Sequence, residues 1–137
     1  MKKQVPVICV ILFLLLLVGC GGIKTNIGDS EKFSEEEIQK SMECIKTYFS
    51  ENFKDCKLKK MSYNEEKSNK NIESYLTNGA GAETGSTAEN TITIFASFHV
   101  SKSAVGALEP GEDYDGFMFT LIRDSKTAEW KVVECGY

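Results

Sequence analysis

Apolar residues recur along this chain with two different periods, and each period predicts a different element. Between positions 34 and 53 they recur at spacings of three and four residues, which is typical of one face of an α-helix. Between positions 90 and 100 they recur at every second position, which is typical of one face of a β-strand. The chain is therefore expected to combine a long amphipathic helix with β-strands.

The start of the helix is marked by several local signals. Ser34 is the expected N-cap, and Glu37 completes a capping box three residues later. Phe33 and Ile38 occupy the two hydrophobic-staple positions around this cap. The expected apolar stripe of the helix consists of Ile38, Met42, Ile45, Phe49 and Phe53.

Four segments have the alternation or composition of strands. These are residues 56–63, 90–100, 116–123 and 129–135. In the first of them the alternation changes phase near Lys59 and Lys60, which predicts a β-bulge. The short links between the last three strands favour an antiparallel meander.

The remaining segments predict a second helix and two loops. Ile72, Tyr75 and Leu76 have helical spacing and indicate a short helix. Residues 77–90 are rich in small and polar residues and are expected to form a mobile loop. Residues 101–115 are expected to form a second loop, with its turn at Pro110 and Gly111.

A single amphipathic helix cannot bury its own apolar face, so we expect it to pack on the sheet. The predicted fold is α+β, with one long amphipathic helix on a curved antiparallel sheet of about four strands and a short second helix. The opposite face of the sheet is expected to be partly open. The side chains expected on the helix-bearing face are Ile92, Ile94, Phe98, Trp130 and Val132.

The first twenty residues have the layout of an export signal. Lys2 and Lys3 precede an almost unbroken apolar run at positions 5–18, which is the length of a signal-peptide core and short for a membrane-spanning helix. Residues 17–20 then resemble a bacterial lipobox, in which a small residue, here Gly19, precedes a cysteine that receives a diacylglyceryl group. The alternative is an uncleaved signal anchor, which the short run and the glycines around Cys20 disfavour.

These signals divide the chain into three parts. Residues 1–19 are expected to be a cleaved signal peptide, residues 20–32 a lipidated N-terminus with a flexible tether, and residues 33–137 a single α+β domain. The lipid on Cys20 would hold the domain at the cell membrane on its extracytoplasmic side, and two acyl chains suffice for stable anchoring.

Charge and cysteine content restrict the partners and the chemistry. Lys2 and Lys3 leave with the signal, so the mature chain is two units more negative than the net charge of −4 of the whole sequence. Nucleic acid is therefore not expected as a partner, and charge alone is not expected to hold the body of the protein on an anionic membrane. A disulfide between Cys56 and Cys135 is one possibility. The preferred alternative is that Cys44, Cys56 and Cys135 are all buried and reduced. No metal site and no cofactor are expected, because the spacings match no zinc pattern.

The mature chain resembles the lipoprotein family called domain of unknown function 4829. The resemblance rests on residues 34–38, 48–49, 52–54, 63–68, 121–125, 130–132 and 136–137. Cys135 departs from the aromatic residue expected at that position. The resemblance implies no catalytic residues, because the family has no established activity. The element order is also similar to the nuclear transport factor 2-like and cystatin-like rolls, which host enzymes, binders and assembly domains alike.

His99 is the main candidate for chemistry, because the unperturbed pKa of histidine lies near neutrality. A roll-type enzyme would use it as a general base with Asp113 or Asp115, whereas the alternative is an ordinary histidine on a solvated sheet face. Glu109, Glu112, Asp113 and Asp115 form an acidic loop that lacks the spacing of a calcium-binding EF-hand. Phe95 and Tyr114 belong to a set of aromatic residues that would line a small pocket or simply the core.

No constellation of residues predicts a reaction. We therefore expect a membrane-anchored, non-enzymatic module that binds a protein or small-molecule ligand through its open sheet face and the two loops. His99, Phe95, Tyr114, Asp113 and Asp115 are its candidate binding residues. The alternatives are a small roll-type enzyme that uses His99 and a structural accessory protein of the cell envelope.

Overall fold

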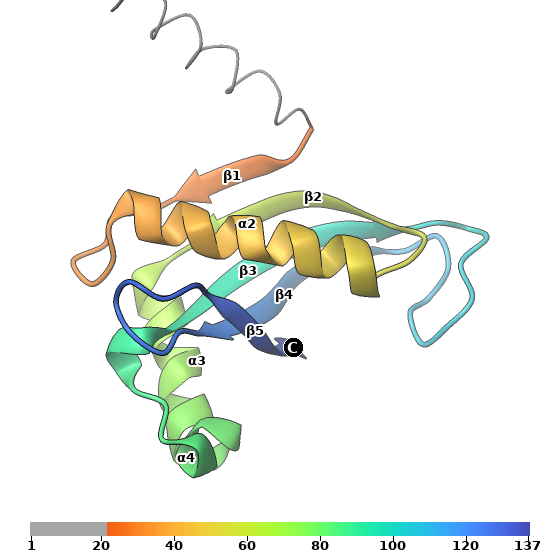
Figure 1. Ribbon diagram of the computed structural model, residues 1–137. Helices are drawn as coiled ribbons and strands as arrows, with labels where there is room; N and C mark the ends of the chain where they lie inside the picture. Colours follow the sequence, from red (N-terminus) through yellow and green to blue (C-terminus); the bar gives the residue numbers. More distant parts are fainter. Residues whose placement is uncertain (1–21) are drawn as a thin grey trace, which may run out of the picture.

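The computed structural model describes residues 22–137 as a curved sheet with a long helix on one face (Figure 1). The strands are β1 (Lys24–Ile27), β2 (Cys56–Tyr63), β3 (Thr91–Val100), β4 (Asp113–Ile122) and β5 (Lys131–Gly136). They lie in sequence order, with β1 parallel to β2 and every other neighbouring pair antiparallel. The expected α+β class is confirmed, although the sheet has five strands rather than about four.

Helix α2 (Glu35–Asn52) forms where the apolar stripe predicts it. The Ser34 side chain accepts from the Glu37 N–H, and the Glu37 side chain accepts from the Ser34 N–H, so the capping box is complete. Ile38, Met42 and Ile45 are fully buried against the sheet. Phe53 lies just beyond the helix, where its ring stacks on that of Phe49 at 4.6 Å.

The core lies between α2 and the face of the sheet that this helix covers. The apolar residues of β3 that were expected to face the helix are buried there, together with Phe119 and Leu121 of β4. Trp130 is also buried, and Val132 packs against the same cluster. The bulge expected in β2 is present between Leu58 and Lys60, and it allows Leu58 and Met61 to face the core although three positions separate them.

The prediction of a flexible tether at residues 20–32 is wrong for its C-terminal part, because residues 24–27 form strand β1. This strand pairs with β2 from Lys24 opposite Lys60 to Ile27 opposite Tyr63. The next residues are held as well, since the Glu65 carboxylate accepts hydrogen bonds from the Ser30 hydroxyl at 2.7 Å and from two backbone N–H groups. Backbone pairing with a neighbouring strand leaves little trace in so short a polar sequence. The signal peptide and Cys20 lie outside the described residues.

The expected mobile loop at 77–90 is also wrong. The second helix, α3 (Glu65–Asn78), is longer than the short helix indicated by Ile72, Tyr75 and Leu76, and it starts at an Asn64 N-cap. It is followed by α4 (Ala80–Thr84) and the 3-10 turn η1 (Ala88–Asn90). Gly81 allows this compact arrangement, because a Cβ there would lie 2.5 Å from the Tyr75 ring.

Helix α3 covers one end of the sheet face opposite α2. The Ser68 hydroxyl accepts from the Thr93 N–H, and the Asn71 amide donates to the hydroxyl of Thr93. The rest of that face, which carries Phe95, Ser97 and His99 of β3, is not covered by a helix, and we call it the open face.

The second expected loop is shorter than 101–115, since β4 begins at Asp113. Its turn forms as expected, with Gly111 at a φ of +81° and the Glu112 N–H bonded to the Glu109 carbonyl.

Within residues 22–137, the three cysteines are free thiols. Cys56 lies on β2 and Cys135 on β5, and two strands stand between them. Adjacent strands are about 4.8 Å apart, so this order places the two residues far beyond the Cα separation that a disulfide spans. No helix in this part of the chain is long and apolar enough to span a membrane.

Candidate functional site

Register places three of the candidate residues side by side on the open face. His99 lies opposite Asp113 on β4 and opposite Lys57 on β2. Ser97, two residues before His99, lies opposite Lys60 and beside Asp115. The face therefore carries histidine, hydroxyl, carboxylate and ammonium groups next to one another.

His99 and Asp113 form the pair that a general base requires. The Nδ1 atom of His99 lies 2.7 Å from a carboxylate oxygen of Asp113, which orients the imidazole ring. The His99 side chain is 39 % exposed and that of Asp113 is 82 % exposed, so water competes for both groups. An orienting carboxylate in this position has little of the strength that it has in a closed active site.

Asp115 is engaged in a second pair and does not contact His99. Its carboxylate accepts hydrogen bonds from the Ser97 hydroxyl and from the Gly116 N–H. Both bonds lower the pKa of Asp115, and the bond from Ser97 has the larger effect. Gly116 has a φ of +69° at the point where β4 bulges opposite Ser97. The Ser97 hydroxyl is therefore bound to a carboxylate, and no Ser–His–Asp relay is formed on this face.

The two candidate aromatic residues lie on different faces. Phe95 shares the open face with His99 and is half-buried between Ser62 and Met118. Tyr114 points to the core side, where its ring stacks on that of Phe98 at 5.1 Å and its hydroxyl accepts from the Glu109 N–H. Tyr114 is thus part of the packing and not a neighbour of the His99 pair.

The acidic residues of the 109–115 segment do not converge. Asp113 bonds His99, Asp115 bonds Ser97, and the Glu112 carbonyl pairs with the Val100 N–H. Among residues 22–137, no three His, Cys, Asp or Glu side chains gather closely enough to hold a metal ion.

A larger feature lies on the other side of the sheet, between α2 and β5. It is a groove of about 1140 Å³, bordered by one face of the helix and by the turn and strand that end the chain. We call it the α2–β5 groove. Its lining residues are Glu37, Lys40, Glu43, Cys44, Thr47, Tyr48, Glu51, Arg123, Lys126, Thr127, Ala128, Glu129, Trp130, Lys131 and Val132.

The floor of this groove is weakly polar and uncharged. The Cys44 thiol donates to the Trp130 carbonyl at 3.2 Å, and burial raises the pKa of this thiol. Burial likewise raises the pKa of Tyr48, whose hydroxyl interacts with the thiol of Cys135. These groups therefore stay protonated at neutral pH. The rim carries four carboxylates and four cations, so the groove as a whole is nearly charge-balanced.

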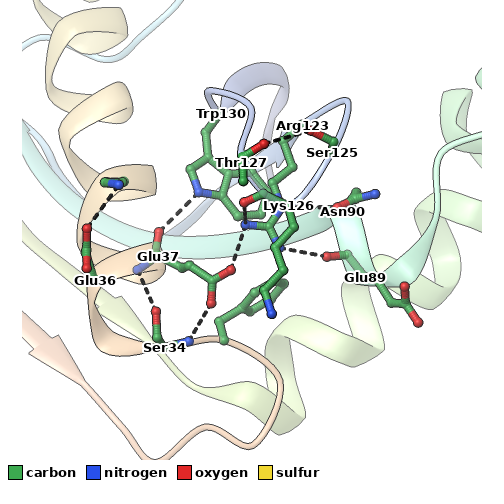
Figure 2. A network of polar contacts seen from close by, with 12 residues as sticks. Ser34, Glu36, Glu37, Glu89, Asn90, Arg123, Ser125, Lys126, Thr127 and Trp130 are labelled. Atoms are coloured by element: carbon green, nitrogen blue, oxygen red, sulfur yellow. Dashed lines mark hydrogen bonds and ion pairs between the residues drawn. The ribbon is translucent and has the colours of Figure 1, made fainter.

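One end of the groove is fixed by a buried arginine (Figure 2). The Arg123 guanidinium donates to the Glu37 carboxylate at 2.9 Å, to the Asn90 side chain and to the carbonyls of Glu89 and Lys126. Its planar group also lies 4.5 Å from the Trp130 ring. The arginine thereby joins the start of α2 to η1 and to the β4–β5 turn, and it holds the groove walls in place.

Sequence reasoning missed both the groove and this arginine. The spacing to Ser34 assigns Glu37 to the capping box, and the apolar run before Arg123 places that residue at the end of a strand, but neither pattern pairs the two. The signal available in the sequence was an arginine directly after the apolar run 117–122, where a charged side chain needs a buried partner. The identity of that partner depends on the fold.

Comparisons of the chain with family models, curated proteins and solved structures found no match. The resemblance to the family called domain of unknown function 4829 therefore stays a prediction.

Proposed function

We propose that this protein is a lipid-anchored, exported binding module whose α2–β5 groove takes an extended polypeptide segment. The observation that carries the binding half of the proposal is the position of the groove beside β5. This strand is an edge of the sheet, and the groove lies between that edge and the helix.

The chemistry of the groove suits an extended peptide. An edge strand offers unpaired N–H and C=O groups to a peptide main chain, and the neighbouring surface then selects its side chains. Tyr48 and Val132 supply apolar surface in the floor, while the charged rim is nearly neutral in sum. We expect a segment of low net charge whose alternate side chains are apolar. The bulge at Val133 limits the paired length to a few residues.

The anchoring half of the proposal rests on the sequence before residue 22. Two lysines, an apolar core of signal-peptide length and a lipobox that ends at Cys20 stand in the required order. Cys20 lies outside the described residues, so covalent analysis must test it. Mass spectrometry of the purified chain should find an N-terminus at Cys20 that carries a diacylglyceryl group. In Cys20→Ala the signal should stay uncleaved, and a cleaved, membrane-bound variant would contradict the proposal.

The peptide proposal can be tested by filling the groove. Peptides would be selected from a random library on the detergent-solubilised lipoprotein, and their affinities measured by fluorescence anisotropy. Thr47→Trp places a large ring on the exposed helix wall of the groove, and we expect it to weaken binding about tenfold or more.

Ser50→Trp is the matched control, because Ser50 is exposed on the same helix but does not line the groove. Its peptide affinity should stay within about twofold of the unmodified protein. Equal loss in both variants, or a selection that enriches no peptide, would contradict the proposal.

The bond between His99 and Asp113 favours a second candidate function, a small enzyme that uses His99 as general base. His99 and Asp113 do not line the α2–β5 groove, and the pair is open to water. They also do not line a second, smaller pocket, which lies against α3 between Lys32 and Ala88. A substrate bound there would have few walls to orient it. His99→Ala should accordingly leave peptide affinity unchanged, whereas an activity lost in this variant would support the enzyme.

A further inference from the structure

The open face carries opposite charges on its two sides. On one side, β1 and β2 present Lys24, Lys57 and Lys60. Lys57 and Lys60 are paired with residues of β3 that lie on this face, and Lys24 is paired with Lys60. Asp113 and Asp115 project from β4 on the same face. The mature chain is negative overall, so this separation of charge is a local property that the net charge conceals.

The basic side forms a continuous strip along one edge of the sheet. Lys59, in the β2 bulge, adds a fourth exposed ammonium group, and we call the strip the lysine edge: Lys24, Lys57, Lys59 and Lys60. Within the described part of the chain, none of the four forms a salt bridge. Lys60 acts on Asp115 only through its charge, which contributes last to the lowered pKa of that carboxyl.

The carboxylates of the open face screen the lysine edge incompletely. Asp113 and Asp115 lie on β4, separated from β2 by β3, and their carboxylates are hydrogen-bonded to His99 and Ser97 rather than to a lysine. An external anionic surface that approached from the side of β1 would therefore meet the ammonium groups first.

The residue proposed to carry the lipid is close to this edge in sequence. Cys20 precedes Lys24 by four residues, a chain length that spans at most about 14 Å. Because β1 runs parallel to β2 with Lys24 opposite Lys60, the chain enters β1 from the side of Lys57. Figure 1 shows that α3 and α4 lie at the other end of the sheet, whereas the loop between β3 and β4 lies at this end.

We infer that the lysine edge docks on an anionic lipid surface, that of the membrane in which the lipid of Cys20 is inserted. This inference rests on the lipid anchor of the proposed function. The anchor supplies the proximity that a negative chain lacks, and the lysine edge then sets the orientation, because lysines near an anionic surface are attracted to it within about a Debye length. In this orientation β1 and β2 face the membrane. β5 and the α2–β5 groove face away from it, because β5 is the opposite edge of the sheet.

The test measures the accessibility of individual lysines in the full lipidated protein. The protein would be reconstituted in vesicles of phosphatidylcholine, with or without about 30 % phosphatidylglycerol, and labelled briefly with a water-soluble amine reagent. Mass spectrometry then gives the labelling rate of each lysine. On the anionic vesicles we expect the labelling rate of the lysine edge to fall to about one third of its rate on neutral vesicles, or lower. Salt of about 0.5 M should restore the rate.

Lys40, Lys126 and Lys131 line the groove on the far side and serve as internal controls, with rates that should not depend on the lipid. The combined substitutions Lys57→Glu, Lys59→Glu and Lys60→Glu should abolish the protection of Lys24. The matched set Lys40→Glu, Lys126→Glu and Lys131→Glu should preserve it.

Two different failures can be told apart. In the first case the chain carries its lipid and floats with both kinds of vesicle, but the lysine edge is labelled at the same rate on both. The proposed orientation is then wrong, whereas the lipid anchor is confirmed. If the chain carries no lipid on Cys20 and does not float, the anchor fails and the docking inference fails with it.

Discussion

At the scale of single residues, Glu37 shows what sequence can and cannot predict. Its role in the capping box follows from its spacing to Ser34, and the structure confirms that role. Its second role, as the partner of Arg123, joins residues that are 86 positions apart. Local spacing carries no information about such a pair, because the fold alone brings its members together.

The buried ion pair predicts a large loss of stability when one member is removed. The side chains of Arg123 and Glu37 are 5 % and 19 % exposed, so the pair is mostly covered. Arg123→Met leaves the Glu37 carboxylate with only its bond to the Ser34 N–H, and it removes the donor from the carbonyls to which the guanidinium was bonded. We expect the free energy of unfolding, measured in urea, to fall by about 3 kcal/mol or more. Lys40→Met breaks the exposed pair with Glu36 and should cost less than about 1 kcal/mol. Equal losses would refute the assignment.

The same carboxylate predicts part of the acid sensitivity. The backbone N–H of Ser34 is the largest cause that lowers the pKa of Glu37, and the Arg123 side chain adds to it. Because the folded pKa lies below the unfolded value of about 4.3, the stabilisation is present above that pH and is lost as the pH falls through the folded pKa. Glu37→Gln should be less stable at neutral pH and should lose less stability on acidification. Parallel stability curves between about pH 7 and pH 3 would contradict this prediction.

At the scale of elements, strong patterns were predicted well and weak ones were not. The stripe of α2 and the alternation of β3 each bury most of one face, so their sequences carry the period of the element. Helix α3 buries only Ser68, Ile72 and Tyr75, and most of its length shows no stripe. Strand β1 has four residues, none of them fully buried, and its existence depends on pairing with β2.

The attachment of the segment after β1 to α3 predicts a local effect. Glu65 accepts hydrogen bonds from the Ser30 hydroxyl and from the N–H groups of Glu31 and Lys32. Glu65→Ala removes all three, and we expect amide hydrogen exchange in residues 24–32 to become about tenfold faster or more. Glu66→Ala, at the next position of the same helix end, is the control and should leave exchange in this segment unchanged. If both variants behave alike, Glu65 does not hold the segment.

At the scale of the whole molecule, the sheet order determines what the two ends of the chain can do. β1 and β5 form opposite edges, so the segment nearest Cys20 and the α2–β5 groove are separated by the width of the sheet. The meander of β3, β4 and β5 was predictable from three strand patterns in succession with no helical pattern between them. The place of β1 was not, because parallel pairing across a helix leaves no local signal. The candidate site was predicted only in part: His99 meets Asp113, but the groove is built from segments distant in sequence.

The short connection between Cys20 and Lys24 predicts how docking depends on chain length. A flexible Gly/Ser insert of about 12 residues before Gly22 adds a mean reach of about 20 Å, which lets the domain move well beyond the Debye length from the membrane. The effective concentration of the lysine edge at the lipid surface then falls, although the anchor and the charges are unchanged. We expect its lysines to label on anionic vesicles almost as fast as on neutral ones, while the protein still floats with both. The same insert placed after Gly85, which is exposed between α4 and η1 at the other end of the sheet, should leave the protection intact. If the protection survives the first insert in full, the lysine edge binds anionic lipid without help from the short connection.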